Sequence, residues 1–168
     1  KKLDELCCRL SKLRQKEGKK LIERISQGLK DLNFIDVQFS MEFRRLEQYS
    51  AGGYDEAEFL ISTNPGMPIR PLGMVASGGE LSRIMLAIKA VLADTDDIPT
   101  LIFDEIDTGI SGRTAQKVSE KLAYIAGNHQ VICITHLPQI AAMADVHFEI
   151  AKQSEKGATT TSIRELGE

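Results

Sequence analysis

The first 32 residues carry apolar side chains at the spacing of a helix. Leucines recur in steps of three and four residues, which is the heptad spacing of a coiled coil over two repeats. These are Leu3, Leu6, Leu10 and Leu13. The pattern slips at Gly18 and resumes at Leu21. Two interpretations stay open, the end of a coiled-coil arm or one long helix docked on a domain. We expect residues 1–33 to form a helical stem and residues 34–168 to form a lobe.

Two regions alternate apolar and polar residues, as half-buried strands do. Residues 37–43 and 56–62 flank a polar loop and predict one β-hairpin. Residues 146–152 and 159–166 predict a second hairpin that turns around Gly157.

Between the hairpins the pattern predicts a strand–helix–strand unit. The segments "TLIF" at 100–103 and "QVICIT" at 130–135 are short continuous apolar runs, typical of buried parallel strands. Residues 111–127 predict the helix between them, and residues 138–144 predict a further short helix. The two strands of such a unit run parallel, so both end at one edge of the sheet. We therefore expect an α/β fold, and ligands bind at that edge in open α/β sheets.

The segment "SGGELSRIMLAIKAVL" predicts an amphipathic helix with an unusual first turn. Ser77 and Glu80 have the spacing of a capping box, in which both side chains satisfy backbone amides of the first turn. Gly78 and Gly79 each cost about 1 kcal/mol relative to alanine in a helix. Glycine is suited to positions where another group approaches the backbone closely. Because a helix N-terminus attracts anions, this turn is either a plain helix cap or an anion site.

Ionisable residues follow both predicted parallel strands directly. Asp104 and Glu105 come after the first strand, and His136 comes after the second. An aspartate at a strand end can hold Mg²⁺, and an adjacent glutamate can polarise a water molecule. A histidine ring can donate a hydrogen bond to a phosphate oxygen. An apolar strand that ends in Asp-Glu is a Walker B pattern, although solvated loop residues would give the same letters.

The phosphate-binding loop that such a site requires is missing from the sequence. The pattern G-x-x-x-x-G-K-[ST] does not occur, and the one Gly-Lys pair, at Gly18, is followed by a second lysine. The chain also begins with a lysine. We therefore expect a fragment of a longer protein whose preceding part carries the phosphate-binding loop.

Composition narrows the class of protein. The 168 residues suffice for one domain with a sizeable core, and the net charge of −3 gives no overall basic signature for nucleic-acid binding by this chain. No apolar run approaches the roughly 20 residues of a membrane-spanning helix, so we expect no membrane partner. The three cysteines form no C-x-x-C pair, which fits a reducing compartment and disfavours a zinc site.

Three stretches carry a family resemblance. They are "NPGMPIRPLGMVASGGELSRIMLAIKAVLA", "TLIFDEIDTGISG" and "HQVICITHLPQIAAMAD". Together they closely resemble the RecN family of bacterial DNA repair proteins, which belongs to the SMC-like ATPases with heads of the ATP-binding cassette type. The resemblance implies that this chain is the C-terminal lobe of such a head, preceded by the end of a coiled-coil arm. It also implies double-strand break repair and recombination as the function, in the cytoplasm at the nucleoid.

The resemblance assigns a role to each candidate residue. Asp104 would help to hold Mg²⁺, Glu105 would be the general base, and His136 would be the switch histidine. Ser77 and Gly79 would contact the γ-phosphate of ATP held on a second head, within a nucleotide-binding turn that comprises Ser77, Gly78, Gly79 and Glu80. The implied cofactors are ATP and Mg²⁺. The implied partners are the P-loop lobe of the same protein, a second copy of the protein, and DNA.

Two positions depart from the family pattern, and two other classes of protein stay open. Ala76 stands where a leucine is usual. The resemblance places Asp107 and Ser111 in the loop that crosses between heads, and Ser111 stands where that loop usually ends in aspartate. The segment "DEID" also resembles the DExD box of helicases, but no other helicase motif accompanies it. Alternatively, the lobe could be a scaffold for dimerisation in which the ATPase motifs are idle. ATP turnover by the longer protein separates these readings.

Overall fold

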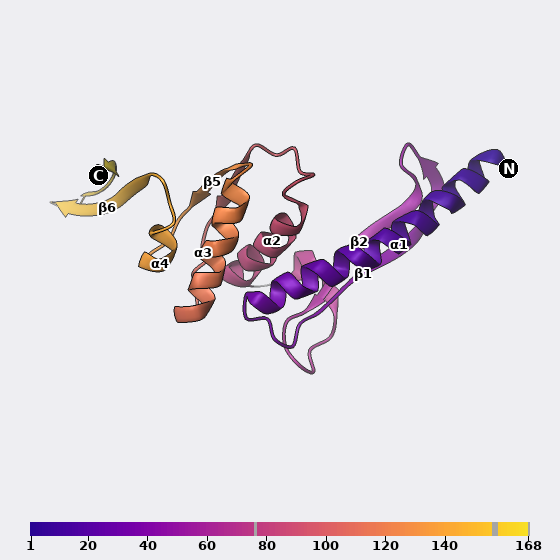
Figure 1. The fold of residues 1–168 in the computed structure, drawn as a ribbon, viewed down its shortest axis with the longest axis horizontal. Coiled ribbons are helices and arrows are strands. Elements are labelled where there is room, and N and C mark those ends of the chain that lie inside the picture. Colours follow the sequence, from indigo (N-terminus) through magenta and orange to yellow (C-terminus); the bar gives the residue numbers. More distant parts are fainter. Residues whose placement is uncertain (76, 156–157, 168) are drawn as a thin grey trace.

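The computed structural model describes residues 1–75, 77–155 and 158–167. The departure expected at Ala76 and the turn expected at Gly157 lie outside these residues. The long helix α1 and the β1–β2 hairpin extend to one side, α2 and α3 lie in the middle, and β6 projects at the other end (Figure 1). The predicted α/β architecture, with a parallel pair of strands, helices and hairpins, is confirmed.

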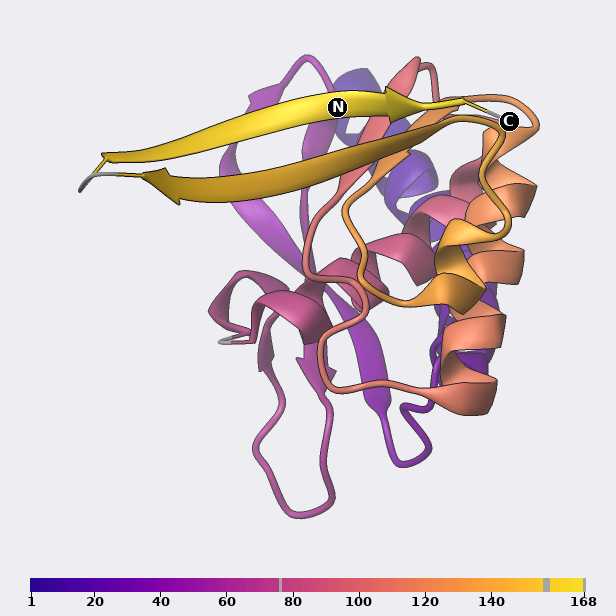
Figure 2. The ribbon, with the colours of Figure 1, turned by 90° about the vertical axis from the view of Figure 1, so that its left-hand side faces the viewer.

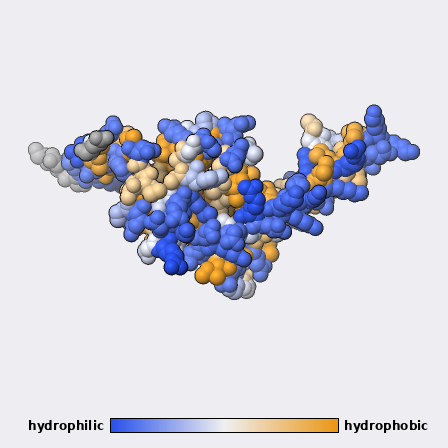
Figure 3. All heavy atoms as spheres, viewed as in Figure 1, coloured by the Kyte–Doolittle hydropathy of each residue, from blue (hydrophilic) through white to orange (hydrophobic). Residues whose placement is uncertain are grey.

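Helix α1 (Lys2–Asp31) is exposed in its first half and belongs to the core in its second half. Leu3 and Leu13 are more than half exposed, whereas Ile25 and Leu29 are fully buried. In the space-filling view, hydrophilic residues cover most of the projecting arm (Figure 3). A division of the chain at residue 33 stays a prediction, since the same helix serves the arm and the core.

The first hairpin is longer than the alternating pattern indicated. Strand β1 (Gln38–Ser50) pairs antiparallel with β2 (Gly53–Ser62), and the short strand β3 (Arg70–Pro71) extends this sheet along β2. A side chain at Gly18 of α1 would lie 3.2 Å from the ring of Phe43 on β1. The slip in the leucine pattern at Gly18 therefore coincides with a point where helix and hairpin approach closely.

The predicted strand–helix–strand unit is confirmed. Strand β4 (Thr100–Phe103) pairs parallel with β5 (Gln130–Cys133), and α3 (Gly112–Ala126) connects them. The second strand ends at Cys133, two residues earlier than predicted. Helix α2 (Gly78–Leu92) precedes the unit and packs against α3.

The prediction that both parallel strands are buried was wrong. Phe103 on β4 is 5% exposed, but its neighbour Ile102 is 67% exposed, and Ile132 on β5 is also exposed. Successive side chains of a strand point to opposite faces, so one face of this pair packs on the core and the other is bare. The continuous apolar runs predict two covered faces, and the described residues cover only one.

The C-terminal part forms a second exposed hairpin. A short helix α4 (Pro138–Ala141) ends three residues before its predicted limit, and β6 (His147–Glu155) pairs antiparallel with β7 (Ala158–Leu166). The hairpin extends away from the helices as a two-stranded ribbon (Figure 2). Its apolar residues Phe148 and Ile163 are both more than 60% exposed.

One hydrophobic core joins the second half of α1 to α2, α3 and the inner face of the strands. Its fully buried members include Ile25, Leu29, Ile84, Leu86, Ile106, Val118 and Ile125. None of the helices in the described part of the chain is long and apolar enough to span a membrane.

Candidate active site

The end of β4 is fastened to the first turns of α2. The Ser82 hydroxyl donates a hydrogen bond to the carbonyl oxygen of Asp104 at 2.6 Å. At the start of α2 the hydroxyl of Ser77 accepts a hydrogen bond from the backbone N–H of Glu80, at 3.4 Å. The serine half of the predicted capping box is therefore confirmed, and the helix N-terminus lies beside the Asp104–Glu105 pair.

The two glycines at the start of α2 are needed because the loop after β4 lies against them. A Cβ at Gly78 would be 2.2 Å from a carboxylate oxygen of Glu105. A Cβ at Gly79 would be 2.9 Å from Cβ of Thr108 and 3.0 Å from the carbonyl oxygen of Glu105. The sequence predicted a close approach at this turn, and the closely approaching group in this chain is its own loop.

Glu105 has a strained backbone. Its φ of 57° lies in the left-handed region, where a residue other than glycine costs roughly 1–2 kcal/mol. The residue is exposed, yet its carboxylate turns back to the positive end of the α2 dipole, which favours negative charge. Such outliers persist where surrounding contacts impose them, and they concentrate at functional sites.

The two glycines are expected to respond differently to substitution. Gly79→Ala should lower the free energy of unfolding by about 1–2 kcal/mol, because its methyl group meets the backbone of Glu105 and must displace it. Gly78→Ala is the matched control, since it meets only the end of a flexible side chain and gains helix propensity. Urea denaturation measures both. Equal losses for the two variants would contradict the packing described for this turn.

Asp107 positions His136 from within the protein. One carboxylate oxygen of Asp107 accepts hydrogen bonds from the Thr135 hydroxyl at 2.5 Å and from the backbone N–H of His136 at 2.8 Å. The same oxygen lies 3.0 Å from Nδ1 of His136. Asp107 is 4% exposed, whereas the His136 side chain is 77% exposed. The buried carboxylate thus holds the end of β5 and leaves the imidazole facing solvent.

The charge on Asp107 stabilises the fold. Burial by itself raises the pKa of this carboxyl, but the hydrogen bonds from Thr135 and His136 outweigh burial and bring the pKa below its ordinary value of 3.8. Because the pKa is lowered in the folded state, the ionised carboxylate stabilises the fold at pH values above its ordinary pKa. This stabilisation is lost as the pH falls through the lowered pKa.

Arg83 connects α2 to the loop after β4 and was not identified from the sequence. Its guanidinium donates hydrogen bonds to the carbonyl oxygens of Ile106 at 3.3 Å and Thr108 at 2.8 Å, and it lies over the ring of Phe34. The side chain is buried, and Nε has no partner in the described part of the chain. Burial lowers the pKa of Arg83, opposed by the nearby Glu80 carboxylate. The sequence signal that could have identified Arg83 is its position, as a charged residue, among the apolar residues of α2.

The structure gathers most of the predicted site residues into two adjoining groups. Glu105 lies at the α2 turn, and His136 is held by Asp107 on the neighbouring strand end. No group of three or more potential metal ligands occurs among the described residues. One oxygen of Asp104 accepts the N–H of Glu105 at 2.8 Å, and the side chain is exposed. An exposed carboxylate such as Asp104 would suit Mg²⁺ as one ligand, since this ion takes one or two carboxylates together with phosphate and water.

No family model matches the chain, but individual proteins do. The DNA repair protein RecN of Bacillus subtilis is 45% identical over 172 residues, covering 94% of this chain and 30% of the relative. RecN of Halalkalibacterium halodurans is 44% identical over 94% of this chain and 28% of the relative. RecN of Treponema pallidum is 56% identical over 66% of this chain. The chain thus spans less than a third of the length of these relatives.

Solved structures support the same fold. The Smc head domain of Pyrococcus yayanosii, with a coiled coil and joint, superposes with a TM-score of 0.57 at 20% identity, covering 89% of this chain and 27% of the other. The Smc head domain of Pyrococcus furiosus gives a TM-score of 0.56, also at 20% identity, over 91% of this chain and 36% of the other. Identity this low supports the fold alone. With 41–45% identity to several RecN proteins along nearly its whole length, the chain belongs to the RecN family of DNA repair proteins, as an α/β lobe with the fold of an SMC head.

Proposed function

We propose that this chain is one lobe of an ATP-hydrolysing head in a protein that acts in DNA double-strand break repair and recombination. Two heads dimerise when ATP is bound between them, and they separate after hydrolysis. The observation that carries the proposal is the contact between the loop after β4 and the first turn of α2. Through this contact the Walker B-like acid pair lies beside the glycine turn at the N-terminus of α2.

Each candidate residue has a chemical role in this proposal. The carboxylate of Asp104 would hold Mg²⁺, and that of Glu105 would take a proton from the attacking water. The His136 ring, positioned by Asp107, donates a hydrogen bond to a phosphate oxygen. Mg²⁺, when bound, neutralises charge on the phosphates.

The α2 turn serves the nucleotide of the second copy. The Ser77 hydroxyl and the Gly79 amide bind its γ-phosphate, and the nucleotide-binding turn is completed by Gly78 and Glu80. The N-terminus of α2 supports this assignment because the partial positive charge of a helix N-terminus attracts anions.

The remaining part of the protein supplies the phosphate-binding loop in this proposal. That lobe covers the bare face of the β4–β5 pair, where Ile102, Ile132 and Ile134 are exposed. Contiguous exposed apolar side chains are typical of interaction surfaces. The longer protein binds DNA and works in the cytoplasm at the nucleoid, as the resemblance to RecN implies.

The other two classes receive less support. A DExD-box helicase does not account for the glycine turn of α2, which packs on the acid pair here. A scaffold lobe with idle motifs does not account for the strained backbone at Glu105.

The proposal is tested by comparing ATP turnover of the longer protein with that of this chain alone. The longer protein should hydrolyse ATP. This chain, which lacks the Gly-Lys loop, should bind ATP·Mg weakly and hydrolyse none. Micromolar affinity for the isolated chain in calorimetry would reveal a nucleotide site of a different kind. A longer protein without turnover would favour the scaffold.

A further inference from the structure

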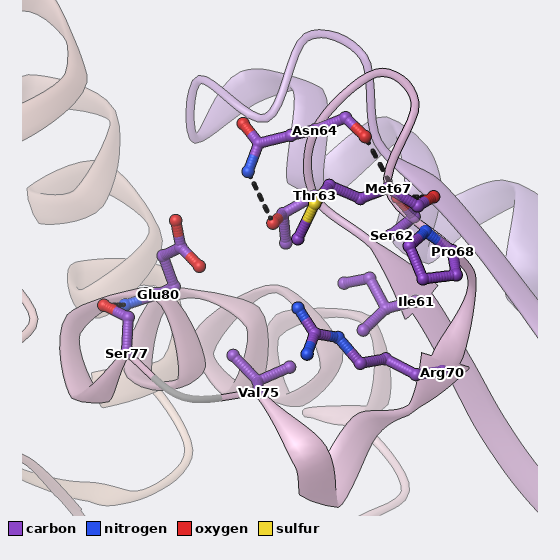
Figure 4. A pocket seen from close by; sticks show the side chains of 10 residues that line it. All are labelled: Ile61, Ser62, Thr63, Asn64, Met67, Pro68, Arg70, Val75, Ser77 and Glu80. Atoms are coloured by element: carbon purple, nitrogen blue, oxygen red, sulfur yellow. Dashed lines mark hydrogen bonds between the residues drawn. The ribbon is translucent and has the colours of Figure 1, made fainter.

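A hollow of about 140 Å³ lies between the loop that joins β2 to β3 and the first turn of α2 (Figure 4). Polar and charged groups line it from both sides. On the loop side these are Ser62, Thr63, Asn64 and Arg70, and on the helix side they are Ser77 and Glu80. The candidate active site and this hollow thus share the first turn of α2.

Among the described residues that line the hollow, Arg70 is the one cation and Glu80 is the one carboxylate. Its side chain extends from β3 towards the first turn of α2 (Figure 4). Within the described ranges, the side chain of Arg70 makes no hydrogen bond and no ion pair, although the Glu80 carboxylate also lines the hollow. Pro68 and Pro71 flank it closely in sequence, and proline restricts the backbone. The guanidinium is therefore available to an acceptor that enters the hollow.

The size of the hollow limits what can enter. Pockets that enclose a whole small ligand measure roughly 300–1,000 Å³, so a hollow of this size takes only part of a nucleotide. The remaining part of the nucleotide must be held by another protein surface. Guanidinium groups bind phosphate oxygens in pairs, and the neighbouring α2 N-terminus adds partial positive charge.

We infer that Arg70 binds the phosphate chain of a nucleotide that is held mainly by a second copy of the protein. This inference rests on the proposed function and adds a residue to it. Arg70 is a direct ligand of the nucleotide in trans, at the same turn as Ser77. It stabilises the dimer in which the nucleotide is enclosed and does not contribute to binding of the nucleotide by a single copy.

The test uses the longer protein, Mg²⁺ and a non-hydrolysable ATP analogue. Arg70→Ala should weaken analogue-dependent dimerisation by about 10- to 100-fold, which corresponds to one charge-assisted hydrogen-bonded pair. Analogue affinity of the dilute monomer should stay unchanged. Arg70→Lys should fall between the wild type and Arg70→Ala, because lysine keeps the charge and loses the paired geometry. Arg9→Ala, an exposed arginine on α1, is the matched control and should behave as the wild type.

The outcomes separate this inference from the proposed function. Wild-type dimerisation by both Arg70 variants overturns the role of Arg70 and leaves the proposed function intact. If Arg70→Ala weakens analogue binding by the monomer as much as it weakens dimerisation, Arg70 contacts the nucleotide held by its own copy. That result overturns the assignment in trans. Dimerisation driven by inorganic phosphate alone overturns the nucleotide as ligand. A wild-type protein that neither dimerises with the analogue nor hydrolyses ATP overturns the proposed function and this inference with it.

Discussion

Glu105→Gln in the longer protein is expected to reduce ATP turnover by about 100- to 10,000-fold, the range attributed to a general base. The amide keeps the shape of the carboxylate but cannot accept a proton from water. ATP should still bind, so the ATP-bound dimer should accumulate. Steady-state turnover measures the first effect, and size-exclusion chromatography with ATP measures the second.

Glu120→Gln is a suitable control for this variant. Glu120 is an exposed carboxylate on α3 that pairs with Lys117 and, among the described residues, makes no hydrogen bond or ion pair with the loop after β4. Its replacement should leave turnover unchanged. Normal turnover by Glu105→Gln would remove Glu105 from the mechanism, whatever the state of the dimer.

The second large effect is expected at Arg83. Arg83→Met keeps most of the side-chain length but leaves the carbonyl oxygens of Ile106 and Thr108 without their donor. Hydrogen bonds from a charged group contribute about 1.5–3 kcal/mol each, and the arginine itself is desolvated, so we expect a net loss of about 2–3 kcal/mol. Turnover should also fall, because the loop that carries Asp104 and Glu105 loses an anchor.

Urea denaturation of Arg83→Met and of Arg113→Met provides the comparison. Arg113 is exposed at the start of α3, so its replacement should change the free energy of unfolding by less than about 0.5 kcal/mol. If the two variants were equally stable, Arg83 would not be the anchor between α2 and the loop. Lost turnover at unchanged stability would instead indicate a direct role for Arg83 in the site.

The sequence predicted the elements whose periodicity is local. Helix α2, the β4–α3–β5 unit and both hairpins follow from alternation, apolar runs and one capping serine. Boundaries were less accurate, as at β1, which continues to Ser50 through polar residues that carry no strand pattern. Apolar runs also overstated burial at β4 and β5, since the sequence cannot show which surfaces lie against another body.

The candidate site was predictable in its residue types and not in its contacts. The glycines of α2 correctly indicated a close approach, but the group that approaches is Glu105, 27 positions after Gly78 in the chain. Arg83 and Asp107 act on backbone groups 23 to 29 positions away. No local pattern encodes such pairs, so the anchors of the site emerged only with the fold. The catalytic roles of Asp104, Glu105 and His136 stay predictions.

Each active site is expected to combine residues of two copies, and a mixing experiment tests this arrangement most directly. One variant of the longer protein carries Ser77→Arg, which blocks the α2 turn with bulk, and the other carries Glu105→Gln. Each variant alone should be inactive. In a mixed dimer both lesions fall in one composite site, so the second site is intact and part of the activity should return. Turnover that stays at the level of the separate variants, in a sample shown to contain mixed dimers, would contradict the shared site.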